Sequence, residues 1–185
     1  MDEQETRQFV VGAASGSQEA FASLYDIYSD PIYRFVFFRV RTKEDAEDLT
    51  QTIFVKAWNA VQRADGDKLA FRSWLYTIAR NTVIDHWKKK KEVQVGSDED
   101  DFFERLVDNQ KTQDERAISA DDAAMLKEQM KTLTAEQQEV LRLRFYDDLT
   151  TIEIAQVLKR KEEAVRALQY RALEALRKNE ENFYE

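Results

Sequence analysis

The most constraining feature of this 185-residue chain is the scarcity of residues that interrupt helices, because it contains one proline and four glycines. Alanine, leucine, glutamate, lysine, glutamine and arginine, which favour helix, are plentiful. With 43% hydrophobic residues, a chain of this length can bury one core or two smaller ones. The sequence therefore predicts an all-α protein.

Apolar residues recur at helical spacing along three segments of the first half of the chain. Residues 17–40 form the first segment, in which Pro31 permits at most a kink or a restart. Residues 42–61 form the second, with Thr42 as the predicted N-cap and acidic residues in its first turn. The predicted buried face of this second segment consists of Leu49, Ile53, Ala57 and Val61. Gly66 interrupts the pattern, and residues 71–91 form the third helix.

The middle of the chain differs in charge and periodicity from both ends. Residues 92–123 contain 11 Asp/Glu and 3 Lys/Arg, so the net charge of −8 for the whole chain is concentrated there. This stretch lacks a sustained apolar period, and helical patterns resume near Ala123. We therefore predict two small helical domains, residues 1–91 and 123–185, joined by an acidic linker at 92–122.

Several classes of site and location are disfavoured by the composition. The chain has no cysteine and a single histidine, His86, which leaves no disulfide, no thiolate and no Cys/His zinc site. The acids Glu44, Asp45, Glu47 and Asp48 fit the dipole of an exposed first helical turn better than a two-metal site, which draws ligands from several elements. We therefore expect no catalytic residue, metal or cofactor. The first residues lack a signal-peptide pattern and no apolar run is long enough to span a membrane, so we expect a cytoplasmic protein without membrane insertion.

The third helix combines apolar residues with residues suited to nucleic acid. On a helical wheel, one side gathers Leu75, Ile78, Ala79, Thr82, Val83 and His86. The other side gathers Tyr76, Thr77, Arg80, Asn81, Ile84, Trp87, Lys88 and Lys91. Cations that bind phosphate, an amide that can read base edges and aromatic rings that stack on unpaired bases are the chemistry of partly melted DNA. The alternative is that Trp74 and Trp87 are core residues and the lysines a solvated helix end.

The last third of the chain carries the pattern of a helix-turn-helix. Apolar residues at Ile152, Ala155, Leu158 and Val165 fit two crossing helices, with the small Ala155 at the crossing. Thr150 and Glu153 can form a capping box at the start of the first helix. Lys159 stands where glycine is usual, so a left-handed turn there would cost roughly 1 kcal/mol. An ordinary helical hairpin is the alternative.

Together, and in this order, these segments resemble the extracytoplasmic-function (ECF) sigma factors of the sigma-70 family, which are promoter-specificity subunits of bacterial RNA polymerase. Residues 20–36, 46–61 and 71–91 resemble region 2 of that family, and residues 133–178 resemble region 4. The resemblance implies a sigma factor that binds core RNA polymerase and directs promoter recognition, promoter melting and initiation. A helix-turn-helix regulator that acts without polymerase is the alternative.

The resemblance also implies roles for individual residues. Those expected to dock on the β′ clamp helices of core polymerase are Asp45, Glu47, Asp48, Leu49, Gln51 and Phe54. Those expected to face the minus-ten promoter element are Arg72, Tyr76, Arg80, Asn81, Trp87, Lys88 and Lys91, with the loop 62–70 helping to hold a flipped base. Those expected to bind the minus-thirty-five element are Lys161, Arg166, Gln169, Tyr170 and Arg171.

The resemblance has one departure and two further implications for partners. Ala164, Ala167 and Leu168 stand where the family commonly has a Thr, a Ser and an Arg, so three polar candidates for DNA contact are missing. The second domain is expected to meet the β flap of polymerase as well as DNA. An anti-sigma factor is a further partner that the resemblance allows.

Overall fold

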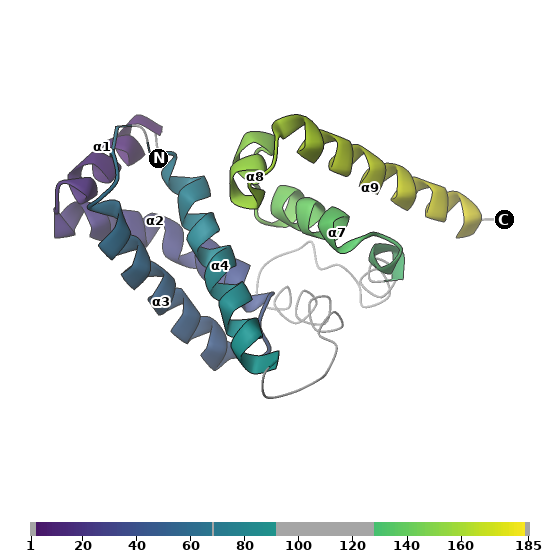
Figure 1. The fold of residues 1–185 in the computed structure, drawn as a ribbon, viewed down its shortest axis with the longest axis horizontal. Coiled ribbons are helices and arrows are strands. Elements are labelled where there is room, and N and C mark those ends of the chain that lie inside the picture. Colours follow the sequence, from purple (N-terminus) through teal and green to yellow (C-terminus); the bar gives the residue numbers. More distant parts are fainter. Residues whose placement is uncertain (1–2, 68, 92–127, 184–185) are drawn as a thin grey trace, which may run out of the picture. The chain divides into compact units, whose positions relative to one another are not determined.

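The computed structural model describes residues 3–67, 69–91 and 128–183, and Figure 1 shows their course. All regular secondary structure in these residues is helical, which confirms the predicted fold class. The chain divides into two compact units, Met1–Val95 and Gly96–Glu185, which we describe separately. The predicted acidic linker at 92–122 lies outside the described residues.

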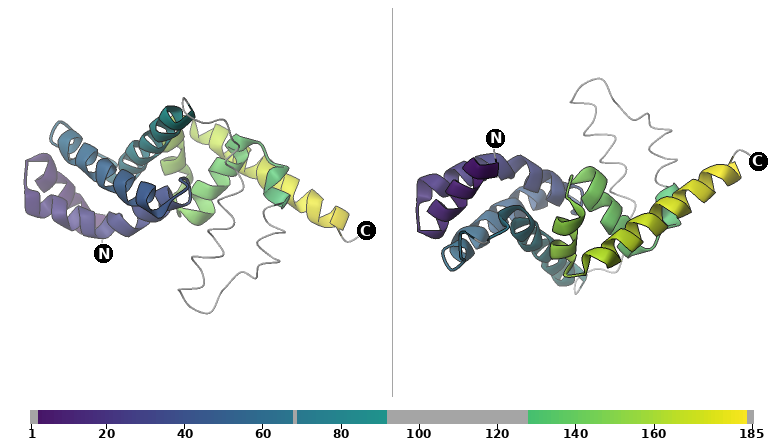
Figure 2. Two further views of the ribbon diagram at one scale, coloured as in Figure 1. Left: turned by 90° about the horizontal axis from the view of Figure 1, so that it is seen from below. Right: turned by 90° about the horizontal axis from the view of Figure 1, so that it is seen from above.

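The first unit consists of the helices α1 (Glu3–Ala14), α2 (Gln18–Phe37), α3 (Lys43–Val61) and α4 (Phe71–Lys91), which pack against one another (Figures 1 and 2). Its core is formed by side chains that are fully buried: Leu24, Ile32 and Phe35 of α2, Ile53 and Ala57 of α3, and Leu75 and Ala79 of α4. The three helices predicted for this part of the chain are therefore present, and α2 continues through Pro31. Helix α1 was not predicted from the sequence.

Side-chain caps start two of these helices, one of them at the predicted N-cap. The backbone N–H of Asp45 donates to the hydroxyl of Thr42 over 3.0 Å, which confirms Thr42 as the N-cap of α3. The hydroxyl of Ser17 likewise caps α2. Because caps depend on residues close in sequence, these helix starts can be predicted without tertiary information.

The second unit begins, in its described part, with a helical turn at residues 128–131. It continues with α7 (Ala135–Leu141), the π-helix η1 (Arg142–Tyr146), α8 (Thr151–Leu158) and α9 (Glu162–Phe183). Its core contains Val140, Leu143, Leu149, Ile154, Val165 and Ala172. Residues 135–146 are thus divided between α7 and η1. The wide turn of η1 closes with the N–H of Asp147 donating to the carbonyl of Arg142 over 3.0 Å.

Helices α8 and α9 form the predicted helix-turn-helix. Thr150 and Glu153 make the capping box of α8, and Ala155 and Val165 are both buried. The turn places Lys159 in the left-handed conformation, with φ 53° and ψ 45°. Ile152, which the pattern puts in the core, is instead 57% exposed, because α8 buries Ile154 and Val157.

Replacing Lys159 with glycine should stabilise the helix-turn-helix by roughly 1 kcal/mol, because glycine adopts the left-handed conformation without steric cost. We expect slower amide hydrogen exchange in α8 and α9 of the full chain. Lys159→Ala is the matched control, since it keeps the β-carbon and removes only the rest of the side chain. Equal exchange rates in the two variants would contradict the assignment of strain to this turn.

Candidate functional site

The first half of α3 presents a polar stripe to solvent. Glu47, Asp48 and Gln51 are exposed, as is Glu44 in the first turn. Acidic side chains at a helix N-terminus are favoured by the helix dipole, so the fold tolerates them there without partners in the core. This stripe is available for contact with another molecule.

Asp45 lies in a different environment from its neighbours, which corrects the prediction that it belongs to an exposed turn. Its carboxylate accepts a hydrogen bond from Lys90 Nζ at 2.8 Å and lies 3.9 Å from Nε2 of His86, so it joins α3 to α4. Burial raises the pKa of Asp45, but the bonds from Lys90 and Thr42 outweigh it and hold the pKa below its usual value. Burial also lowers the pKa of His86.

These shifts predict that the first unit loses stability as the pH falls. The pKa of His86 in the folded protein is below 6.5, so the unfolded chain binds a proton first and stability drops as the pH falls below about 6.5. The pKa of Asp45 is below 3.8, so its contribution is lost only at lower pH. Urea unfolding followed by tryptophan fluorescence reports on this unit, because Trp58, Trp74 and Trp87 all lie in it.

The variant His86→Gln separates the two contributions. It should remove the loss of stability that begins as the pH falls below about 6.5, the ordinary pKa of histidine, and leave the dependence at lower pH that Asp45 contributes. An unchanged slope just below pH 6.5 would show that the pKa of His86 is not lowered by folding.

Aromatic residues lie beside the acidic stripe of α3. Phe54 is only 4% exposed and its ring is 4.7 Å from that of Tyr25 of α2, so it supports the surface from below. Leu49 is half-buried. The exposed apolar residues here are Tyr25 (43%) and Val55 (60%). Val55 follows Asp48 and Gln51 at spacings of seven and four residues, a signal that could have identified it from the sequence.

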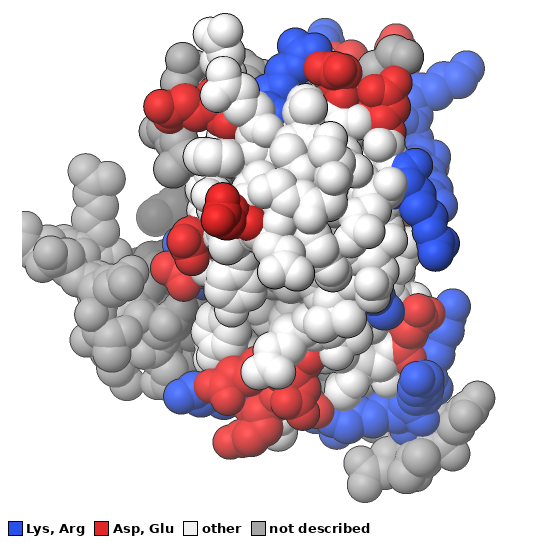
Figure 3. Space-filling view, turned by 90° about the vertical axis from the view of Figure 1, so that its left-hand side faces the viewer, with Lys and Arg blue, Asp and Glu red and all other residues white. Residues whose placement is uncertain are grey.

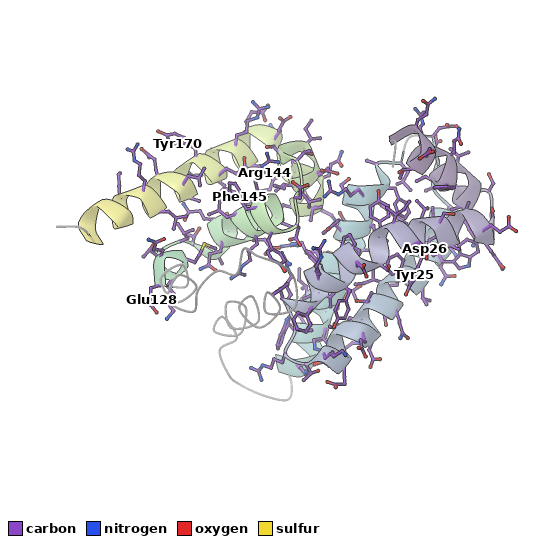
Figure 4. All side chains as sticks on the ribbon, turned by 180° about the vertical axis from the view of Figure 1, so that it is seen from behind. Tyr25, Asp26, Glu128, Arg144, Phe145 and Tyr170 are labelled. Carbon is purple, nitrogen blue, oxygen red and sulfur yellow. The ribbon has the colours of Figure 1, made fainter. Side chains whose placement is uncertain are left out.

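The charges of this unit are unevenly spread. In Figure 3 the centre of the face toward the viewer is largely uncharged, acidic side chains gather at its lower edge, and Lys and Arg lie along its right-hand edge. Figure 4 shows that Tyr25 and the exposed Asp26 both project from α2. We call the combination of Glu47, Asp48, Gln51, Tyr25 and Val55 the α3 surface.

The outward face of α4 is narrower than the helical wheel suggests. Tyr76 is 1% exposed and packs edge-to-face against Phe35, with ring centroids 5.3 Å apart, so its expected place on the outward face is wrong. Of the residues expected to face the minus-ten element, Asn81 and Lys88 are exposed, while Arg72 and Arg80 are half-buried. The side chain of Lys91 lies outside the described residues.

Trp87 combines a structural and an exposed part, so it fits neither sequence-based alternative fully. Its indole Nε1 donates to the carbonyl of Arg39 over 2.8 Å, which ties α4 to the segment between α2 and α3. The residue remains half-buried, and the guanidinium of Arg41 lies 5.6 Å from its ring. Trp87 is thus anchored at its nitrogen, with the rest of the indole partly open to solvent.

Four of the five residues predicted to bind the minus-thirty-five element are exposed: Lys161, which precedes α9, and Arg166, Tyr170 and Arg171 of α9. Gln169 is half-buried, and its amide nitrogen is covered and has no hydrogen-bond partner. Leu168, one of the three departures from the family pattern, is buried in the core of the unit. Figure 4 shows Tyr170 projecting from α9.

Neither a metal cluster nor a membrane-spanning helix is found in the part of the chain that the structure describes. No three His, Asp or Glu side chains there come together to hold an ion. None of the described helices is long and apolar enough to cross a membrane.

Comparison with known proteins links both units to one family. The sigma-70 region 2 model matches residues 24–93 and the sigma-70, region 4 model matches residues 130–178. The ECF RNA polymerase sigma factor BldN of Streptomyces coelicolor is 36% identical over 172 residues, which cover 91% of this chain and 63% of BldN. SigX of Bacillus subtilis, another ECF sigma factor, is 30% identical over 89% of this chain and 85% of SigX.

The fold agrees with this relationship. The structure of CnrH in complex with the cytosolic domain of CnrY aligns with a TM-score of 0.68 and 24% identity, covering 96% of this chain and 98% of that chain. Both family models, the identity to SigX and the helical fold of the described residues agree with one another. The chain belongs to the ECF sigma factors of the sigma-70 family, the non-enzymatic initiation factors that direct RNA polymerase to promoters.

Proposed function

We propose that this chain binds core RNA polymerase through the α3 surface, with the β′ clamp helices as the partner. This proposal is supported by the exposure of the polar residues Glu47, Asp48 and Gln51 beside two exposed apolar residues, Tyr25 and Val55. An apolar patch with charged groups at its edge suits a specific protein interface, since burial supplies affinity and the charges select the partner. Asp45 and Phe54 support this surface from within.

The same unit would bind the minus-ten element through α4. Exposed Asn81 can read base edges, Lys88 can neutralise phosphate, and the partly exposed indole of Trp87 can stack on an unpaired base. The remaining expected contacts are Arg72, Arg80 and Lys91. Tyr76 is too deeply buried to take part without a rearrangement of the core. The loop 62–70 would hold a flipped base, which stabilises melted DNA.

The second unit would bind the minus-thirty-five element with α9 in the major groove. Arg166 and Arg171 can contact guanine edges or phosphate, Tyr170 offers apolar contact, and Lys161 lies at the start of the helix. Gln169 would have to change its side-chain conformation to donate from its amide nitrogen. Leu168 is a core residue, so a polar residue at that position would not belong to this groove-facing set.

The proposal also covers the linker, the bounds of the two units and two further partners. Residues 92–122 would link the units, which we place at 1–91 and 123–185, and the second unit would also meet the β flap. An anti-sigma factor remains a proposed partner, as for RpoE of Bartonella quintana, a structure with the same fold that contains the anti-sigma factor NepR. The proposed activity would take place in the bacterial cytoplasm.

Multi-round transcription from genomic fragments tests the function as a whole. Purified core polymerase should initiate at defined promoters only when this chain is added. A regulator that acts without polymerase would instead bind promoter duplex tightly alone and leave the transcript pattern of core polymerase unchanged. Promoter duplex binding by the chain with and without core polymerase separates the two.

A further inference from the structure

Helix α1 contacts the loop between α3 and α4 at Gly66. A β-carbon built on this glycine would lie 3.0 Å from Cα of Val11, 3.0 Å from Cβ of Ala14 and 3.3 Å from the carbonyl oxygen of Val10. Two of these atoms belong to the backbone of α1 and cannot rotate away. The loop can therefore approach the helix this closely only because residue 66 has no side chain.

Arg7 makes a second connection between α1 and the same loop. Its Nη2 donates to the main-chain oxygen of Asp67 over 3.1 Å and lies 3.7 Å from the carboxylate of that residue. The two side chains are 64% and 72% exposed, so the ion pair adds little to stability. The hydrogen bond does, however, fix the direction of the Asp67 carbonyl, which lies in the loop.

The two ends of the loop are held by the helices that it joins. Ala64 donates to the carbonyl of Val61 over 3.0 Å at the end of α3. At the start of α4, the carbonyl of Ala70 accepts from the N–H of Trp74 over 3.0 Å and from the hydroxyl of Ser73 over 3.1 Å, and Phe71 is buried. Between these ends, Gly66 and Asp67 are the points at which α1 determines where the loop runs.

We propose that α1, through Arg7 and Gly66, holds residues 62–67 of this loop in the conformation that receives an unpaired base of the minus-ten element. The inference rests on the proposed function, which gives the loop that role. A loop that must order itself on binding loses affinity, and a loop already held in place does not. Arg7 and Gly66 are positioning residues, and α1 precedes the segment 24–93 that matches the region 2 model.

Hydrogen exchange of the full chain tests the contact itself. Arg7→Ala should speed exchange of the amides at 62–67 by roughly fivefold, the effect of losing one net hydrogen bond. Gly66→Ala should speed it in the same direction, because the added β-carbon would push the loop away from the backbone of α1. Arg7→Lys should restore part of the protection. Gln8→Ala, a change at an exposed neighbouring position of α1, is the matched control and should leave the loop unchanged.

Abasic scanning then tests the role of the contact. On a promoter identified with the wild-type holoenzyme, each base of the non-template minus-ten strand is removed in turn and open-complex formation is measured. When the base bound by the loop is removed, open-complex formation by the wild-type holoenzyme should fall roughly tenfold, which is within the range for the loss of one stacked base. On the intact promoter, Arg7→Ala and Gly66→Ala should lower open-complex formation roughly fivefold, which corresponds to the free energy of about one hydrogen bond. On the promoter that lacks this base, the two substitutions should lower it almost no further.

Two results would overturn the inference while leaving the proposed function intact. One is an equal loss by the variants on intact and abasic promoters, which a general defect in folding or polymerase binding would produce. The other is faster loop exchange without any change in open-complex formation. Failure of the proposed function looks different, because wild-type holoenzyme would then yield no promoter-specific transcript, and the inference would fall with it.

Discussion

Reversing the charge of Asp48 in the variant Asp48→Lys should abolish the binding of core polymerase while leaving the fold intact. Asp48 is exposed on the α3 surface, so the substitution costs stability only a few tenths to 1 kcal/mol through the helix dipole. Loss of a desolvated charge contact at an interface costs roughly 2–5 kcal/mol, which is at least about a 30-fold loss of affinity. Fluorescence titration of labelled chain with core polymerase measures it.

Two variants act as controls for this result. Asp30→Lys makes the same change in charge on an exposed residue of α2 and should leave affinity nearly unchanged. Asp45→Lys should instead lower the stability of the first unit. Lys90 Nζ now lies 2.8 Å from the Asp45 carboxylate, and in this variant it would face a second cation. If Asp48→Lys bound core polymerase as tightly as Asp30→Lys, the assignment of the α3 surface would be wrong.

Asn81→Ala should slow the opening of duplex promoters about tenfold or more and be partly rescued by a template that is already melted. Asn81 is exposed on α4, so its loss removes a contact to bases or strand without disturbing the core. In a premelted bubble, the cost of unstacking has been met in advance. The measurement is the rate of open-complex formation and the lifetime of the complex on both templates at two salt concentrations.

Three further substitutions on α4 separate the contributions of base contact, phosphate binding and core packing. Lys88→Ala should weaken binding to both templates equally and reduce the salt dependence of that binding, as loss of a phosphate contact does. Trp87→Phe removes the hydrogen bond to Arg39 but keeps a ring for stacking, so its effect shows which part of the indole matters. Tyr76→Ala should cost about 3–5 kcal/mol of stability, as for other buried aromatic residues. Equal damage by Asn81→Ala on bubble and duplex would contradict a role in melting.

Local patterns predicted much of this protein correctly. The paucity of glycine and proline predicted an all-α fold. The caps at Thr42 and Thr150 occur as expected, and the helix-turn-helix forms although Lys159 takes the left-handed conformation that glycine usually occupies. Each of these features depends on residues within a few positions of one another, so the sequence states the physical cause directly.

The sides of the helices were predicted less well, because a helical wheel does not show how many neighbours cover a helix. Helix α4 packs against both α2 and α3, so its buried arc includes Tyr76, which the wheel put outside. Asp45 stands among exposed acids in the sequence, yet Lys90 and His86 of α4 enclose it. Conversely, Ile152 is apolar and exposed.

The sequence by itself determined helices α2, α3 and α4, the capped starts of α3 and α8, the helix-turn-helix and the family. The tertiary structure decided which residues of those helices face outward, because that depends on the packing of segments far apart in the chain. It also revealed α1, whose buried residues Val10 and Ala13 are too few for a clear pattern and are covered only when the helices meet. The contact of Arg7 with Asp67, 60 residues later, could not be read from either segment alone.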